Sequence, residues 1–510
     1  MRLSPRWAIA LAGLCAPAAA AAQTAPDIVV TGRGLDTRPD LNGYDSVEID
    51  RDRLTQSASN RLEDALADVA GLASFRRSDS RSANPTSHGI TLRGIGGNAA
   101  SRALLVLDGV PQADPFAGWI AFPAYAPARL ARVRVVRGGG SGLWGPGALT
   151  GTIELESAGP DDLAPVSAAL SYGSRNAIDA ALGIAARGRG GFATIDAQYQ
   201  RGDGFAPIAN GGPVDRAAPY EQMSLALRGV TRIDPTTEVQ AAIQLFSDRR
   251  DRGLDFTAIK SDGADASVRV VHRGPWRWSA LGYVQTRRFA SRFASVNADR
   301  TVVTPTLDQY QVPGTGLGGR IDIEPPLGGG LTLRIGGDVR ALSGETRERF
   351  TYVAGNPTRQ RQAGGATRTL GGFADLGWRS GAVSVDLSGR IDAWQISGGH
   401  LYKAPIAGGT GGSATLYPDR DGIEPTGRAA LVWGVAPGVE LRVAGYRGWR
   451  LPTLNELYRP FRAGADATAA NPALRPEHLT GIDGGVRWRS GNIDLSVTGF
   501  ADRLEDAIAC

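Results

Sequence analysis

Residues 192–199 have the sequence Phe192-Ala193-Thr194-Ile195-Asp196-Ala197-Gln198-Tyr199, in which polar residues recur at every second position. Because successive side chains of a β-strand point to opposite faces, this stretch predicts a strand with one apolar and one polar face. Stretches 383–390 and 493–500 repeat the pattern. A soluble sandwich would turn the apolar face inward, whereas a transmembrane barrel would turn it towards lipid. The alternation alone leaves both folds open.

Three features favour the barrel for the region that follows residue 157. The alternating segments are about 10–12 residues long, the length that a tilted membrane strand requires. Short connections (187–190, 234–237, 436–438) alternate with long ones (202–220, 344–368, 397–425), as periplasmic turns and outer loops do. Aromatic residues such as Trp276, Trp378 and Trp433 lie near segment ends, where an interfacial belt would place them.

The number of segments bears on whether the barrel closes. We count about fifteen, the last at residues 491–504, whereas bacterial barrels have an even strand number. An unpaired edge is not viable in lipid, so we expect the chain to stop before its barrel is complete. The alternative is that one segment is hidden and the barrel closes with sixteen strands.

The termini and composition exclude several classes of protein. Arg2 and Arg6, the apolar run 7–14 and the small-residue tract 18–22 predict a secretory signal peptide at residues 1–22. Cys15 and Cys510 are the only cysteines, so we expect neither an internal disulfide nor a cysteine metal site in the exported chain, and no cofactor. The net charge is +5, but arginines are interspersed with acids, which does not indicate a nucleic-acid partner.

Residues 23–157 differ in texture and predict one compact α+β unit. Stretch 59–66 predicts a helix capped by Ser59 or Asn60, and stretches 89–92, 103–108 and 133–136 predict strands separated by glycine-rich turns. Ahead of them, residues 27–31 are rich in β-branched side chains and have no partner in the local pattern. Such a stretch suits strand addition to the sheet of another protein.

Several motifs follow one another along the chain. They are Asp27–Thr31, Leu92–Gly96 with Ser101-Arg102, Val106–Pro111, Val133–Gly138 with Leu143–Ile153, and Arg450–Tyr458 with Asn471–Glu477. In this order they resemble the TonB-dependent receptors of Gram-negative outer membranes, of the siderophore and cobalamin type. The first motif is similar to the TonB box, the middle ones to the plug domain, and the last pair to late barrel motifs.

The resemblance implies an α+β plug inside a transmembrane antiparallel β-barrel of about 22 strands, of which about fifteen would be present here. The expected divisions are a signal peptide (1–22), a TonB box with its leader (23–32), a plug (33–157) and an incomplete barrel (158–510). It also implies active import of a scarce solute, a ferric siderophore first and cobalamin as the alternative, by a monomer without enzymatic activity.

The resemblance further implies site residues. A TonB-type energy-coupling protein in the periplasm would bind Asp27, Ile28, Val29, Val30 and Thr31. Plug arginines Arg93 and Arg137 would pair with barrel carboxylates Glu456 and Glu477 and lock the plug to the wall. Ligand-contact candidates in the plug are Arg77, Asp79, Phe116, Trp119, Phe122 and Tyr125, and candidates in the barrel are residues 352–361 and 402–421.

Two other classes stay open on the residues alone. A passive porin would have neither plug nor docking segment, so residues 27–157 argue against it. An outer-membrane enzyme would require a nucleophile with a base, and the four histidines have no recognisable partner motif: His88, His272, His400 and His478. The resemblance also disfavours haem as the solute, because haem receptors of this family usually place a histidine between the two late-barrel motifs, and residues 459–470 contain none.

Overall fold

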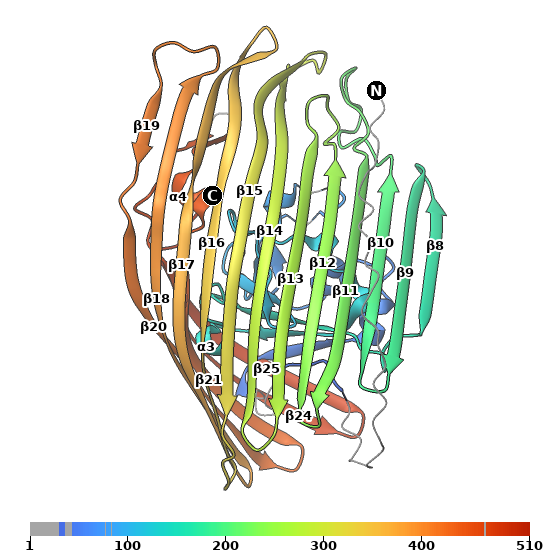
Figure 1. Cartoon of the computed structure of the whole chain (residues 1–510), viewed down its shortest axis with the longest axis vertical. Helices are drawn as coiled ribbons and strands as arrows, with labels where there is room; N and C mark the ends of the chain where they lie inside the picture. The colour runs from blue at the N-terminus through green and yellow to red at the C-terminus, as the bar shows by residue number, and fades with distance from the viewer. Residues whose placement is uncertain (1–29, 36–42, 77, 83, 464–465, 510) are drawn as a thin grey trace.

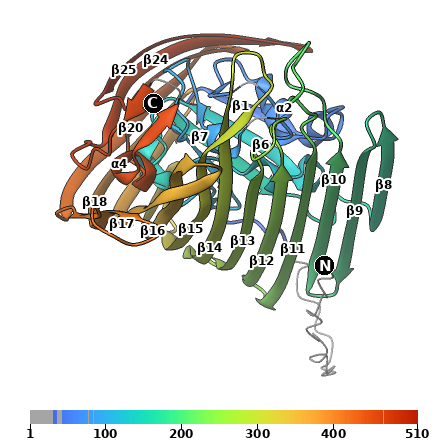
Figure 2. The ribbon, with the colours of Figure 1, turned by 90° about the horizontal axis from the view of Figure 1, so that it is seen from above.

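The computed structural model describes residues 30–35, 43–76, 78–82, 84–463 and 466–509. The predicted signal peptide and residues 27–29 of the predicted docking segment lie outside this range. The described chain has two parts: a small inner domain, up to Ser157, and a long curved sheet, here called the wall, that wraps around it (Figures 1 and 2).

The inner domain is built on a mixed sheet. Its strand order is β1-β6-β7-β4-β5, and β4 runs parallel to β7 while the other pairs are antiparallel. Those strands are β1 (Ser46–Asp50), β4 (Ala103–Leu107), β5 (Val110–Pro111), β6 (Leu130–Arg137) and β7 (Gly151–Ser157). The other elements are α1 (Arg51–Thr55), α2 (Leu62–Ala67), β2 (Ala73–Ser74), η2 (Pro85–Ser87), β3 (Ile90–Thr91), η3 (Phe122–Ala124), η4 (Pro127–Arg129) and α3 (Ser141–Trp144).

The strands expected at 89–92, 103–108 and 133–136 are confirmed as β3, β4 and β6. The helix is also present, but its predicted cap is wrong. Helix α2 has Arg61 at its N-cap without a side-chain cap bond, because Asn60 has a φ of 51° and belongs to the preceding turn. The apolar face formed by Leu62, Ala65 and Leu66 is buried as expected.

The wall is a 16-stranded antiparallel sheet, in which strands from β8 to β25 follow in sequence order and β19 pairs beside β18. Its strands are β8 (Val166–Gly173), β9 (Ala177–Gly188), β10 (Gly191–Gly202), β11 (Tyr220–Asp234), β12 (Thr237–Arg250), β13 (Ile259–Arg273), β14 (Arg277–Val296), β15 (Val303–Glu324), β16 (Leu331–Val353), β17 (Asn356–Ser380), β18 (Val383–Pro405), β19 (Ser413–Leu416), β20 (Arg420–Ala436), β21 (Val439–Arg450), β24 (Glu477–Ser490) and β25 (Ile493–Glu505). Within the described residues β8 and β25 pair with one neighbour each, so closure by sixteen strands is not observed.

The short connections are confirmed, since β9 and β10, β11 and β12, and β20 and β21 are joined by tight turns. Two of the expected long loops are corrected. Residues 344–368 belong mostly to β16 and β17, which stay paired as far as Val353 and Asn356, and residues 397–425 contain parts of β18, β19 and β20. Both faces of these stretches carry polar side chains, as in Glu345–Arg349, so the apolar–polar alternation that marks a strand is lost there.

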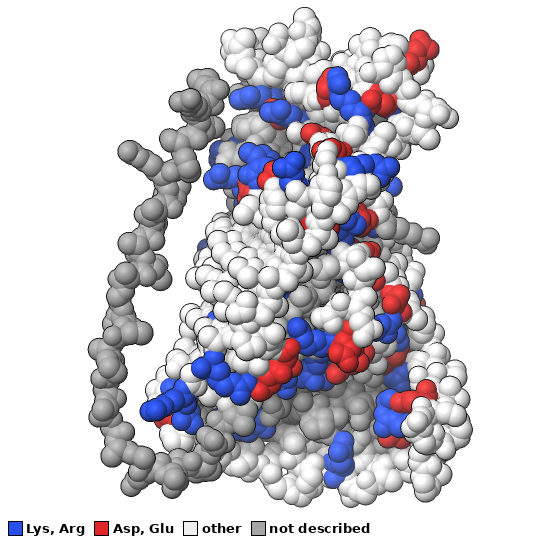
Figure 3. Space-filling model, turned by 90° about the vertical axis from the view of Figure 1, so that its right-hand side faces the viewer, with Lys and Arg blue, Asp and Glu red and all other residues white. Residues whose placement is uncertain are grey.

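The exposure of the wall residues decides between sandwich and barrel. On β12, Gln240 and Gln244 are each only 6% exposed, whereas Ile243 and Leu245 are 47% and 42% exposed. Polar side chains therefore face the inner domain and apolar side chains face outward, as in a transmembrane barrel. In Figure 3 charged residues form an upper and a lower band on the visible face, and a largely uncharged zone lies between the two bands on its left side. None of the described helices is long and apolar enough to cross a membrane.

Between β21 and β24 the chain leaves the wall and turns inward. Helix α4 (Leu454–Tyr458) lies there, followed by β22 (Phe461–Ala463) and β23 (Asp466–Thr468). Thr453 and Glu456 form a capping box at its start, in which each side chain accepts a hydrogen bond from the backbone N–H of the other. Leu454, Leu457 and Tyr458 are buried against the inner domain and β16–β18, so this short helix joins the two parts.

Candidate functional site: the interface between the inner domain and the wall

Residues 31–34, which overlap the end of the predicted docking segment, lie on the inner face of the wall. Arg273, the last residue of β13, donates hydrogen bonds to Thr31 Oγ1 at 2.9 Å and to the carbonyl of Arg33 at 2.8 Å. Gln240 of β12 donates to the same carbonyl at 2.7 Å, and Arg228 of β11 donates to the carbonyl of Gly32. The described part of the segment is thus stowed against three neighbouring strands, at the end of the wall with the short turns.

One group of buried charges joins the inner domain to the last strands of the wall. Glu477, the first residue of β24, has no exposed side-chain surface and accepts bonds from Arg102 at 2.7 Å and from Arg450 at 2.6 Å. Arg450 also binds Glu456 at 2.9 Å, and Asn98 of the inner domain donates to the same Glu456 at 3.1 Å. Burial alone would raise the pKa of the Glu456 carboxyl, but Arg450 outweighs it and holds the pKa below its ordinary value.

A second group lies deeper along the same strand. Asp483 is six residues after Glu477 on β24, hence on the same face, and it pairs with Arg93 of the inner domain at 2.6 Å. Arg93 also lies 5.4 Å from the ring centroid of Tyr446, whose hydroxyl accepts one of its hydrogen bonds. Both guanidinium and carboxylate are 1% exposed, so this contact is as dry as a protein core.

These contacts correct the predicted pairing of Arg93 and Arg137 with Glu456 and Glu477. The register of β24 places Glu477 opposite Arg102, and Arg93 meets Asp483. Arg137 pairs with Asp45 of its own domain at 2.9 Å. Its link to the wall is indirect, since Arg442 of β21 lies 3.4 Å from the same Asp45 carboxylate. The sequence contains two clues to the observed pairs. Arg102 belongs to the motif Ser101-Arg102, and Asp483 lies an even number of positions after Glu477, hence on the same face of the strand.

The aromatic ligand-contact candidates are not on an accessible surface. Phe116, Trp119, Phe122 and Tyr125 are 2%, 3%, 2% and 3% exposed and belong to the core of the inner domain. Trp119 packs edge-on against Phe289 of β14, with ring centroids 5.8 Å apart. Contact of these rings with a ligand stays a prediction, because in this state of the chain they are packed inside the inner domain and against the wall, and a tight apolar contact uses the same residue types as an aromatic binding surface.

The two polar ligand-contact candidates of the plug are Arg77 and Asp79. Arg77 lies outside the described residues. Asp79 is half-buried and paired with Arg81 at 3.0 Å. Burial would raise the pKa of the Asp79 carboxyl, but Arg81 and Arg61 keep it below its ordinary value. Stretch 78–82 is therefore a charged part of the inner domain next to β11, where Gln222 donates to the carbonyl of Ser80 at 2.8 Å.

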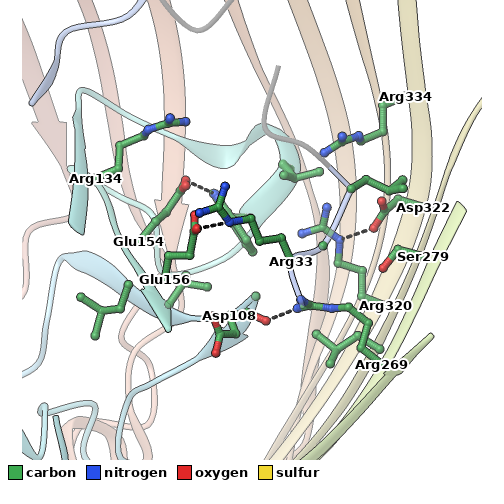
Figure 4. Close-up of a pocket in the computed structure, with 18 of the residues that line it drawn as sticks. Arg33, Asp108, Arg134, Glu154, Glu156, Arg269, Ser279, Arg320, Asp322 and Arg334 are labelled. Carbon is green, nitrogen blue, oxygen red and sulfur yellow. Dashed lines mark hydrogen bonds and ion pairs between the residues drawn. The ribbon is translucent and has the colours of Figure 1, made fainter. Parts of the chain in front are cut away.

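A cavity of about 320 Å³ separates the inner domain from β13–β16 (Figure 4). It lies at the same end as residues 31–34, here called the stowed segment, and Arg33 crosses it to pair with Glu156. Arg269 extends from the wall to the carbonyl of Asp108. The charged residues of its lining are Arg33, Asp108, Arg132, Arg134, Glu154, Glu156, Arg269, Arg320, Asp322 and Arg334.

Family models match both parts of the chain. The model for the TonB-dependent receptor plug domain matches residues 40–152, and the model for the TonB-dependent receptor-like β-barrel matches residues 170–510. No curated protein sequence is similar enough to the chain to count as a match.

Solved structures share the fold at low sequence identity. The ferric yersiniabactin uptake receptor FyuA from Yersinia pestis matches with a TM-score of 0.70 at 15% identity, over 91% of this chain and 73% of that one. The copper transporter OprC matches with a TM-score of 0.71 at 18% identity, over 90% and 72%. A double mutant of the hemophore receptor HasR from Serratia marcescens, in complex with its hemophore HasA and heme, matches with a TM-score of 0.68 at 14% identity, over 91% and 73%.

Proposed function

This chain belongs to the TonB-dependent receptors, and on that premise we propose that it imports a scarce solute, a ferric siderophore first, across the outer membrane. The inner domain is the plug. The observation that carries the proposal is the stowed segment, because residues 31–34 are tied to the plug by Arg33–Glu156 and to the wall by Arg273. A segment held in this way can pass a pull to both parts.

The energy would come from a periplasmic TonB-type protein that pairs with residues 27–31 as an added strand. Main-chain hydrogen bonds supply the affinity in such an encounter, which suits the β-branched sequence of Ile28, Val29, Val30 and Thr31. The buried groups around Glu477 and Asp483 would hold the plug in register until it is pulled. No chemistry is done on the solute.

Uptake tests the proposal. The chain is produced in a Gram-negative host that lacks its own receptors, and accumulation of a ferric siderophore, copper ions and haem is measured with and without residues 27–31. We expect one of the three probes to accumulate, and its uptake to be lost on deletion while binding to the cell surface remains. Uptake that survives the deletion would mean passive diffusion, and a chain that modifies its ligand would be an enzyme.

A further inference from the structure

Three cavities follow one another along the wall strands β14, β15 and β16. The lowest is the 320 Å³ cavity, bordered on β14 by Ser279 and Leu281. The highest, of about 140 Å³, is bordered on the same strand by Tyr283 and Gln285. Because these four residues alternate along one strand, they share its inner face and form a continuous line past the plug.

A small third space joins the two. It measures about 10 Å³ and shares Leu281 and Arg320 with the lower cavity and Tyr283 and Arg340 with the upper one. A space of this size holds at most about one water molecule, so the passage is shut to any larger solute. The three cavities therefore adjoin one another along the plug, and the space between the lower and the upper one is the narrowest of the three.

The plug side of the narrow point is the end of α3. Trp144 borders both the lower cavity and the narrow space, and its ring lies 4.9 Å from the guanidinium of Arg320. Its indole N–H donates to Glu154 at 2.8 Å. Arg340 of β16 donates to the carbonyls of Trp144 and Pro146, the latter at 2.8 Å, and so fastens this part of the plug to the wall.

The backbone around Trp144 is suited to move. Six of the ten residues from 138 to 147 are glycine, and Gly138, Gly145 and Gly147 have φ values of 88°, 63° and 95°. Glycine adopts these conformations without a steric penalty and changes between them readily. On the other side the plug is fixed by the buried pairs Arg102–Glu477 and Arg93–Asp483.

From these observations we propose that the imported solute crosses the level of the plug along β14–β16, and that Trp144, fastened by Arg340, is the gate. The inference rests on the proposed import function and deepens it by naming the route. Import then requires α3 and the plug residues that face β15, such as Pro115, to part from the wall, while the plug keeps its contacts with β21 and β24.

The charge of the path indicates the class of solute. The lower cavity has six arginines and four carboxylates in its lining. Arg269 makes its bonds with the carbonyl of Asp108 and with Gln240, and within the described chain it has no ion pair with a carboxylate. A confined space with an excess of positive charge favours an anion, so the route selects a negatively charged solute such as an anionic metal chelate.

Ion conductance tests the route without any ligand or energy source. The test uses a form of the receptor whose barrel is closed; its native cysteines are replaced by serine, and it is reconstituted in planar lipid bilayers in potassium chloride. We expect W144A and R340A to conduct roughly ten times more than the parent, because removing the indole or its fastening widens a passage that holds about one water. W144F is the matched control and should stay closed. Each variant counts as folded when it migrates like the parent on gels run without heating.

The position of the path is tested by thiol labelling in the W144A background. A negatively charged methanethiosulfonate reagent should reduce the conductance when the cysteine is at Ser279 on β14. The same reagent should have no effect when the cysteine is at Ser224, a buried inner-face position on β11 away from the path. In a potassium chloride gradient the reversal potential should have the sign expected for a path that passes chloride better than potassium. The R269Q substitution should make this reversal potential smaller.

The outcomes separate the route from the proposed function. If W144A and R340A stay closed while both are folded, or if Ser224 is the sensitive position, the route is overturned whatever the solute. Because conductance requires neither residues 27–31 nor a ligand, it can support the route even where uptake of every probe fails. Uptake with an unaffected gate would instead keep the import function and reject this path.

Discussion

At the scale of single residues, Glu477 is a carboxylate on which several contacts between plug and wall converge. It accepts bonds from Arg102, Arg450 and the backbone N–H of Ile508, the last at 2.7 Å. One carboxylate thus compensates two buried guanidinium groups that come from the plug and from the wall. A buried ion pair of this kind is weak evidence for stability in itself. Removing one partner is costly, however, because the other charge stays buried with neither water nor a partner.

Replacing Glu477 by alanine should therefore loosen the plug. We expect the plug to lose about 3–5 kcal/mol of stability, because Arg102 would be left with an uncompensated buried charge, whereas Arg450 keeps its pair with Glu456. The measurement is hydrogen exchange of plug peptides in the full-length protein in detergent. The control is E505A, which removes a carboxylate from an exposed pair with Arg503, 3.0 Å away, and should change nothing measurable. Equal exchange in both variants would remove Glu477 from the plug contact.

His88 gives the plug a dependence on pH. Its side chain is buried against Phe122, with ring centroids 5.4 Å apart, and its Nε2 has no partner among the described residues. Burial first, and then the charge of Arg250, lower the pKa of His88 from 6.5 to about 3. Below pH 6.5 the unfolded chain takes up a proton that the folded chain refuses, so this contribution to stability is full above 6.5 and falls towards pH 3.

Between pH 7 and pH 5 the plug should therefore lose about 2 kcal/mol, since the unfolded histidine is protonated over some 1.5 units of that range. The loss should be absent in H88L, which keeps an apolar side chain against Phe122. Hydrogen exchange of residues 90–107, corrected for the intrinsic effect of pH on exchange, compares the two proteins. The same slope in both would assign the pH dependence to other groups.

The residue scale is also where prediction from sequence stops. Which arginine meets which carboxylate depends on the register of β24 against the plug, and no local pattern encodes a contact between residues 102 and 477. Likewise, Phe116 and Trp119 have the composition of a binding surface, and only the shape of the wall shows that they are packed against it.

At the scale of elements, the sequence predicts much more. Alternation identifies the strands wherever one face meets lipid, as on β10 and β18, because the period of two is imposed by the backbone. It fails on the outer parts of β16 and β17, where both faces carry polar residues. The cap of α2 is displaced because Asn60, a good cap residue, adopts a positive φ in the turn.

Under the proposed function, the stowed segment (residues 31–34) is the element whose release would couple the receptor to its periplasmic partner. Arg273 holds it through Thr31 and Arg33, and bonds from a charged donor contribute about 1.5–3 kcal/mol each. In R273A we expect a cysteine at Val30, which leaves Thr31 intact, to react with a maleimide at least about tenfold faster, since each lost bond is worth more than the roughly 1.4 kcal/mol that corresponds to a tenfold change in the exposed population.

The control for this element is R249A. Arg249 lies near the outer end of β12 and pairs with Asp262 at 3.2 Å, so its loss should leave the labelling rate as it was. An unchanged rate in R273A would instead assign the holding of the segment to Gln240 and Arg228, which bind the carbonyls of Arg33 and Gly32.

At the scale of the whole molecule, the plug is held asymmetrically. Its side towards β21 and β24 carries the buried ion pairs of Arg93 and Arg102, whereas its side towards β14–β16 borders the cavities. The sequence predicts that a plug and a wall exist, because their textures differ on either side of residue 157. It does not predict the asymmetry, which arises from the distant pairing of the N-terminal domain with the last strands.

This asymmetry predicts where a cross-link stops import. A Cβ placed at Gly314 on β15 would lie 3.6 Å from the Cβ of Pro115 in the plug, within the range that a disulfide spans. In a background without native cysteines, P115C/G314C should lose uptake of whichever probe the receptor imports when oxidised and regain it on reduction, because the bond fastens the plug to the wall that it must leave. Each single variant should import normally in both conditions. If the oxidised double variant imports at the rate of the reduced one, the plug does not part from β15, and the solute must pass on the side of the buried ion pairs.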